Sequence, residues 1–200
     1  MLKTFSILLV SLVFYSPENK KSNEWETKIN ELDYQVLVRE SDISDIKEIK
    51  IVHKFKGNFK KLVLALNNIE TNKKLFNSCT EARLLKQLDA HSSYQYFYFK
   101  MPLTISDRDI ISKVTIHSTD TTYSLVSSAA DSKIASFKSK VIRITQANTS
   151  WQFKKTRSGD IHMEYYASAD PKGKIPKWLV NAFAIREARI SIDKLKKMIQ

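Results

Sequence analysis

Few side chains in this 200-residue sequence stand at spacings that could do chemistry. The four histidines lie far apart, and His162 shares the face of a predicted strand with Glu164. That pair could act as a general base or bind a metal, but two neighbours on the solvent side of a strand are the better explanation. Asp107 and Asp109 flank Arg108 in a turn that enters a strand, where we expect a hydrogen-bonded corner rather than a catalytic pair.

The motifs of several enzyme classes are absent from the sequence. It has no GxSxG, GxxxxGKS/T, GxGxxG or HExxH pattern, and its 3 glycines are too few for a phosphate-binding loop. The one cysteine, Cys79, can form neither an internal disulfide nor a zinc knuckle. We therefore expect no catalytic residue, no cofactor and no metal, and a fold that is stabilised by packing.

The charge balance favours an anionic partner. The sequence has 33 Lys+Arg against 21 Asp+Glu, a formal net charge of +12, which attracts nucleic acid, membrane surfaces or acidic ligands. Most of the basic residues are lysines, whereas base reading in DNA relies on the planar fork of arginine. We therefore expect no specific nucleic-acid partner, and a basic polyanion-binding module is kept as one alternative function.

The first residues are typical of an export signal. Lys3 is followed by an almost unbroken apolar run from Phe5 to Phe14. This run is too short for a membrane span, which needs about 20 residues, but it suits a signal peptide, whose apolar region has about 7–15. We therefore predict a signal peptide over residues 1–16 and export to the periplasm or outside the cell. A linker over 17–23 and one folded domain over 24–200 would follow. The alternative is that the first residues form an uncleaved anchor or a buried N-terminal segment.

Apolar periodicity predicts helices and strands in an α+β order. Trp25, Ile29 and Leu32 stand at helical spacing and predict a short first helix, after which extended segments continue to Gly57. Asn58 then caps a predicted helix over 59–69.

The second half of the chain alternates with period two before one last helix. Short polar turns separate the alternating segments, which predicts an antiparallel meander. The segments are 82–88, 94–101, 110–117, 123–130, 141–146, 151–155 and 161–169. Pro176 then opens a helix that runs to the C-terminus; its first half is apolar nearly all round, which predicts cover on both sides there.

Two segments of the sequence resemble START domains, the lipid-transfer family related to steroidogenic acute regulatory protein. The first is Ser106-Asp107-Arg108-Asp109-Ile110-Ile111, preceded by Met101-Pro102. The second is the run from Asp170 to Asn181, which is similar to the closing region of the family, where D-x-x-G-x-I/L-P leads into the C-terminal helix. The resemblance runs from about Trp25 to the end of the chain. It implies a helix-grip fold, in which a curved antiparallel sheet wraps around the terminal helix and encloses a hydrophobic tunnel for a single lipid.

The side chains that face the interior are candidates for lining such a tunnel. Alternation after Asp109 places Ile110, Ser112, Val114 and Ile116 on the inner face. The other candidates are Gln95, Phe97, Phe99, Ile142, Ile144, Gln146, Met163, Tyr165, Ala184, Ala188, Ile192 and Leu195. Both faces of the strand over 94–101 are aromatic, so Tyr94, Tyr96 and Tyr98 are the alternative to Gln95, Phe97 and Phe99 on its inner face. A close-packed core uses the same residue types, so both interpretations stay open at this point.

The family resemblance also bears on what the tunnel would recognise. Some sterol-binding relatives carry a buried acid and a buried base, and the aligned positions here hold Gln95 and Val114. The charge pair is therefore absent, which leaves Gln95, Gln146 and Ser112 available to bond a hydroxyl or an ester.

The predicted gate of the tunnel is the loop over residues 130–140 together with the first half of the last helix. Phe137 could enter a membrane while Lys133, Lys138 and Lys140 approach anionic headgroups, so an anionic membrane surface is a second predicted partner besides the lipid.

A cyclase- or aromatase-like enzyme on the same fold is the other alternative function. It would need an ionisable side chain that points inward. The alternation places Arg143, His162 and Glu164 outward, so we favour non-catalytic lipid binding and transfer.

Overall fold

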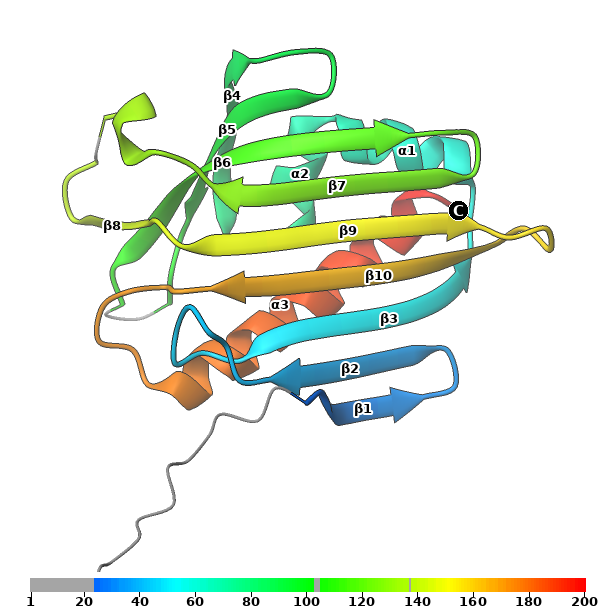
Figure 1. Ribbon diagram of the computed structural model, residues 1–200, viewed down its shortest axis with the longest axis horizontal. Coiled ribbons are helices and arrows are strands. Elements are labelled where there is room, and N and C mark those ends of the chain that lie inside the picture. Colours follow the sequence, from blue (N-terminus) through cyan, green and yellow to red (C-terminus); the bar gives the residue numbers. More distant parts are fainter. Residues whose placement is uncertain (1–23, 103–104, 137) are drawn as a thin grey trace, which may run out of the picture.

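The computed structural model describes residues 24–102, 105–136 and 138–200. The predictions for residues 1–23 and for Phe137 lie outside this part of the chain. Within it, ten strands form one sheet in the order β1-β2-β3-β10-β9-β7-β6-β5-β4, and β8 pairs with β6 (Figure 1). The strands are β1 (Glu26–Glu31), β2 (Tyr34–Arg39), β3 (Glu48–Lys56), β4 (Cys79–Gln87), β5 (Ser92–Phe99), β6 (Asp107–Ser118), β7 (Thr122–Ala129), β8 (Val141–Ile144), β9 (Ala147–Lys155) and β10 (Asp160–Ala169).

The helices lie on one side of this sheet (Figure 1). They are α1 (Phe59–Asn67), α2 (Ile69–Leu75) and the long C-terminal α3 (Lys177–Met198), and a 3-10 turn, η1 (Ser132–Ile134), lies between β7 and β8. The strands of the main path pair antiparallel, whereas β8 runs parallel to β6. The α+β fold predicted from the sequence, with a curved antiparallel sheet packed on a C-terminal helix, is confirmed.

The predicted first helix is wrong, because the residues from Glu26 form a strand. β1 pairs with β2, and Ile29 lies opposite Val36. Leu32, the third member of the apparent helical stripe, is 99% exposed in the turn between the two strands. The backbone hydrogen bonds offered by β2 therefore override the local apolar spacing.

The helix predicted over 59–69 is interrupted by Asn68. This residue is extended, and its side chain accepts a hydrogen bond from the backbone N–H of Glu70, which starts a second helix, α2. The break turns α2 into a separate element that the sequence pattern did not predict, and α2 becomes a wall of the site described below.

The core lies between the sheet and the C-terminal half of α3. Ala188, Ile192 and Leu195 are buried against side chains of β2, β3, β9 and β10. The N-terminal half of α3 is only partly covered, and Trp178 is 72% exposed. The prediction that the first half is covered on both sides is therefore wrong for this tryptophan.

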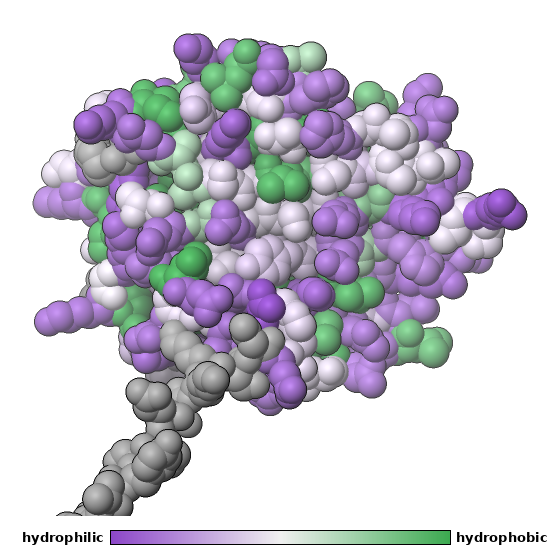
Figure 2. All heavy atoms as spheres, in the orientation of Figure 1, coloured by the Kyte–Doolittle hydropathy of each residue, from purple (hydrophilic) through white to green (hydrophobic). Residues whose placement is uncertain are grey.

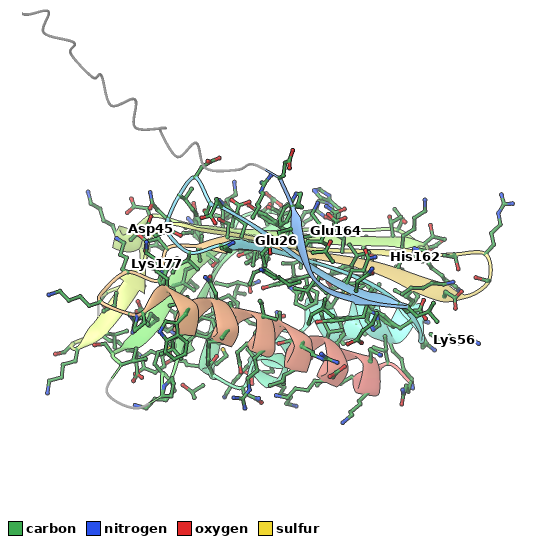
Figure 3. All side chains as sticks on the ribbon, turned by 90° about the horizontal axis from the view of Figure 1, so that it is seen from below. Glu26, Asp45, Lys56, His162, Glu164 and Lys177 are labelled. Carbon is green, nitrogen blue, oxygen red and sulfur yellow. The ribbon has the colours of Figure 1, made fainter. Side chains whose placement is uncertain are left out.

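The opposite face of the sheet is polar. It carries mostly hydrophilic and weakly polar side chains with isolated apolar ones (Figure 2). His162 and Glu164 are exposed on the side of the sheet away from α3, as the alternation predicts (Figure 3). No helix in the described ranges is long and apolar enough to cross a membrane.

A polar junction, formed by Asp107, Arg108 and Asp109 at the start of β6, ties three segments of the chain together. Asp107 accepts hydrogen bonds from the Tyr98 hydroxyl, from Lys100 Nζ at 2.9 Å and from the Met101 backbone at 3.0 Å. These bonds lower the pKa of Asp107 to about 2. The hydrogen-bonded corner predicted here is thus present.

The other two residues of the polar junction point to different partners. Arg108 donates to the carbonyl oxygens of Pro171 and Lys172, at 3.3 and 2.9 Å, and so holds the segment that leads into α3. Asp109 is buried and accepts from Arg143 Nε at 2.9 Å and Nη2 at 2.6 Å.

Arg143 lies opposite Asp109, whereas its neighbour Ile144 lies opposite Ile110 on the inner face, so Arg143 points outward as the alternation predicts. It is nevertheless buried rather than exposed to solvent. It donates to the backbone oxygens of Ala135 and Ser136, at 2.8 and 3.0 Å, so the loop after β7 covers it on the outer face. Arg143 therefore connects this loop to the polar junction.

Removing the Arg143 guanidinium should destabilise the fold strongly, because the buried Asp109 carboxylate loses this counter-ion and keeps the weaker hydrogen bond from the Tyr96 hydroxyl. We expect Arg143→Met to lower the free energy of unfolding by about 3–5 kcal/mol. Lys177→Met breaks an exposed pair with Asp45 and is the control, for which we expect a change within about 1 kcal/mol. Urea unfolding measures both, and equal small losses would contradict this role of Arg143.

Candidate ligand-binding site

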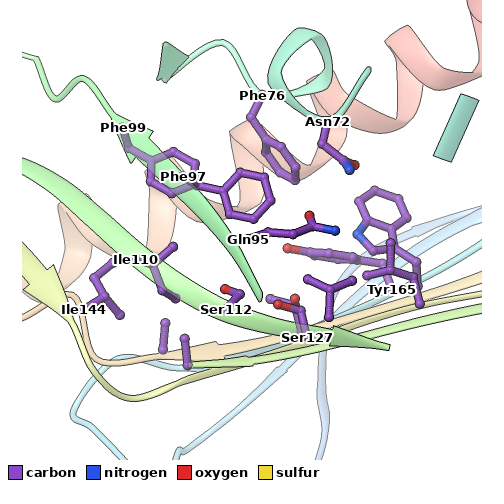
Figure 4. Close-up of a pocket in the computed structure, with 16 residues that line it drawn as sticks. Asn72, Phe76, Gln95, Phe97, Phe99, Ile110, Ser112, Ser127, Ile144 and Tyr165 are labelled. Atoms are coloured by element: carbon purple, nitrogen blue, oxygen red, sulfur yellow. The ribbon is translucent and has the colours of Figure 1, made fainter. Parts of the chain in front are cut away.

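A hollow lies between the inner face of the sheet and the α2 region (Figure 4). Its volume is about 230 Å³. Strands β5 to β10 supply most of its wall, and Asn72 of α2 and Phe76, which follows α2, close it from the other side.

Half of the predicted lining residues meet at this hollow. Those that line it are Gln95, Phe97, Phe99, Ile110, Ser112, Val114, Ile144 and Tyr165. They come from β5, β6, β8 and β10, which are far apart in the sequence but face the same interior.

The other predicted lining residues lie elsewhere. Met163, Ala188, Ile192 and Leu195 are buried in the packed core, and Ile116 and Ala184 pack against that core. Ile142 lies against Gly173. Gln146 is exposed between β8 and β9, because β8 ends at Ile144 and its alternation stops there.

The void is therefore next to Val114 but not next to Ala188. The C-terminal half of α3 rests directly on the sheet, and α2 rather than α3 faces the hollow. Alternation identifies the inner face of a strand, but it does not tell which part of that face is filled by the helix.

Several lining residues were not predicted. They are Asn72, Phe76, Leu125, Ser127, Ala147, Thr149, Trp151 and Ala169. The members on β7 and β9 follow each other at steps of two, so the alternation used for the other strands could have identified them. Asn72 and Phe76 gave no such signal, because α2 itself was not predicted.

The wall of the hollow is apolar with a few neutral polar groups. Of the described residues that line it, none is Asp, Glu, Lys, Arg or His, and Tyr165 is the one that carries a titratable hydroxyl. Burial raises the pKa of Tyr165, so this hydroxyl stays protonated at neutral pH. Within the described ranges, no three His, Cys, Asp or Glu side chains gather closely enough to hold a metal ion.

The segment between β7 and β8, which carries the described gate residues, lies at the end of the sheet where α3 begins (Figure 1). Lys133, Lys138 and Lys140 are exposed. Lys138 also pairs with Glu81, and its Nζ lies 4.6 Å from the centre of the Tyr98 ring. Lys177 and Trp178, at the start of α3, lie at the same end.

Comparison with known proteins matches this chain to the START domain family. The sequence model of the START domain matches residues 12–197. An uncharacterized protein of Pseudomonas aeruginosa, PA1579, is 24% identical over 89% of this chain and 88% of its own length. Human START domain-containing protein 10 is 23% identical over 58% of this chain, and that match spans 40% of the human protein.

Solved structures share the fold. Human STARD10 superposes with a TM-score of 0.76 at 20% identity, over 87% of this chain and 72% of that one. A STAR-related lipid transfer protein from Xanthomonas axonopodis superposes with a TM-score of 0.73 at 20% identity, over 86% of this chain and 97% of that one. START domains generally bind and transfer lipids or other hydrophobic ligands and are generally not enzymes. With the family match covering most of its length, this chain belongs to the START domain family.

Proposed function

We propose that this protein binds and transfers a single lipid or other hydrophobic molecule, which it holds in the hollow without covalent chemistry. The observation that carries the proposal is an apolar hollow of about 230 Å³ between the inner face of the sheet and the α2 region. Burying a few hundred Å² of ligand surface at roughly 25 cal/mol per Å² would contribute on the order of 5–10 kcal/mol, before the costs of ordering the ligand.

The chemistry of the wall supports binding over catalysis. Acid–base catalysis needs an ionisable group with a suitable pKa beside the substrate. His162 and Glu164 are on the outer face of the sheet, and the buried Arg143 is engaged by Asp109 and by backbone oxygens rather than lining the hollow. The volume is smaller than the roughly 300–1,000 Å³ of common small-molecule sites, so a large ligand would require the walls to move apart.

Filling the hollow with a larger side chain should weaken ligand binding. Ser127 of β7 lines it, whereas its neighbour Ser128 points to the other face of the sheet. We expect Ser127→Phe to weaken binding of a fluorescent fatty-acyl probe by at least about tenfold, and Ser128→Phe to leave it unchanged. Fluorescence titration measures both, and equal affinities for the two variants would place the ligand outside the hollow.

We propose that the end of the sheet carrying Lys133 and Lys140 faces an anionic membrane during transfer. The two lysines are exposed, and the exposed Trp178 lies at the same end. Each lysine near an anionic surface contributes about 1 kcal/mol, and tryptophan suits the membrane interface.

Charge reversal at this end should weaken membrane binding. We expect Lys133→Glu and Lys140→Glu each to reduce binding to phosphatidylserine-containing vesicles by at least about fivefold, because about 1 kcal/mol is lost with the lysine and the new carboxylate is repelled as well. Lys60→Glu, on α1 at the opposite end of the sheet, is the control. Vesicle sedimentation at low and high salt tests this proposal, and the same loss from the Lys60 variant would refute a specific membrane-facing end.

We propose export to the periplasm or outside the cell, on the strength of the apolar run after Lys3. Terminal sequencing of the protein recovered from cell fractions should find a mature chain that begins near residue 17, in the exported fraction. A cytosolic chain that still begins at Met1 would contradict it.

A further inference from the structure

One buried acceptor in the wall of the hollow has no partner. Among the described residues, two buried side-chain polar atoms lack a hydrogen bond: Tyr34 Oη and Gln95 Oε1. Of these two residues, Gln95 alone lines the hollow. Its amide nitrogen is already used, since Nε2 donates to Ser93 Oγ at 3.1 Å. The side chain therefore presents its carbonyl oxygen as the unsatisfied atom.

An unpaired buried acceptor is costly, and a ligand that donates to it removes the cost. Buried polar groups in folded proteins are nearly always hydrogen-bonded, so an unpaired buried acceptor indicates that a donor is missing. The same acceptor would remain unpaired beside a hydrocarbon, an ether or a simple ester, because none of these has a donor to offer.

The remainder of the wall disfavours a charged ligand. The described lining residues include no cationic or anionic side chain. A buried phosphate or carboxylate would therefore lie without a counter-ion, which is far more costly than burying a neutral hydroxyl.

A second polar group in the hollow suits the same kind of ligand. Gln95 on β5 and Tyr165 on β10 come from strands that β6, β7 and β9 separate, and both side chains reach into the hollow (Figure 4). The Tyr165 hydroxyl can donate to an oxygen atom of the ligand, while the Gln95 oxygen accepts from it.

We propose, building on the function proposed above, that the ligand is an uncharged amphiphile with a slender apolar body and a hydroxyl or amide N–H that donates to Gln95 Oε1. The hollow of about 230 Å³ fits a single chain of medium length better than a two-chain lipid.

A series of matched ligands tests this specificity. Decane, 1-methoxydecane, 1-decanol and decanoate share one apolar chain but differ in donor and charge. Isothermal titration calorimetry at pH 8 with wild type, Gln95→Met and Gln152→Met compares them; Gln152 is exposed on the outer face of β9, opposite Glu164, and serves as the matched control. Retained decane binding by Gln95→Met shows that the hollow is intact.

We expect wild type to prefer 1-decanol over 1-methoxydecane by a ratio about tenfold larger than that of Gln95→Met, and Gln152→Met to keep the wild-type ratio. Decanoate should bind at least about tenfold more weakly than 1-decanol. Equal ratios in wild type and Gln95→Met, or an equal loss in Gln152→Met, would overturn the role of Gln95. Tight decanoate binding would overturn the uncharged ligand. In both cases, binding of decane would still support the proposed function. Binding of none of the four would contradict the proposed function itself.

Discussion

The hollow exists because α3 packs closely on the sheet at its C-terminal half and more loosely at its N-terminal half. At its C-terminal end the helix is held closely: the Asn58 backbone donates to the Ile199 oxygen at 2.8 Å, and a Cβ at Gly57 would lie 2.8 Å from Ile199 Cδ1. The buried residues of α3 begin only at Ala188, so its N-terminal half lies more loosely on the domain. Because the helix fills one end of the curved sheet, the inner faces of β5 to β9 meet α2 instead, with space between them.

The polar junction at the start of β6 holds the loops around that looser end. Three consecutive residues point to three separate segments: Asp107 to the chain after β5, Arg108 to the segment before α3, and Asp109 through Arg143 to the loop after β7. The two aspartates of this motif resemble a pair of catalytic acids, but their role here is to hold these segments in place. Burial and charge-assisted hydrogen bonds make the junction rigid. The segments proposed to face a membrane are anchored to the same strand that lines the hollow.

The sequence predicts the fold better than it predicts the site. Alternation identifies most strands and their inner faces, because a half-buried strand must alternate. It does not tell a packed inner face from a vacant one: Met163 and Tyr165 are neighbours on one face of β10, yet Met163 lies in the core and Tyr165 lines the hollow. That outcome depends on where α2 and α3 rest, and the cap at Asn68 that separates α2 from α1 is a single side-chain interaction without a periodic signal.

If the hollow is a ligand site, the protein should carry a guest molecule in it. Mass spectrometry of the intact protein under native conditions, followed by analysis of its organic extract, tests occupancy and ligand class together. We expect one neutral amphiphile per chain, released on denaturation. A protein that is empty as purified, and that stays empty after incubation with a total lipid extract, would contradict it.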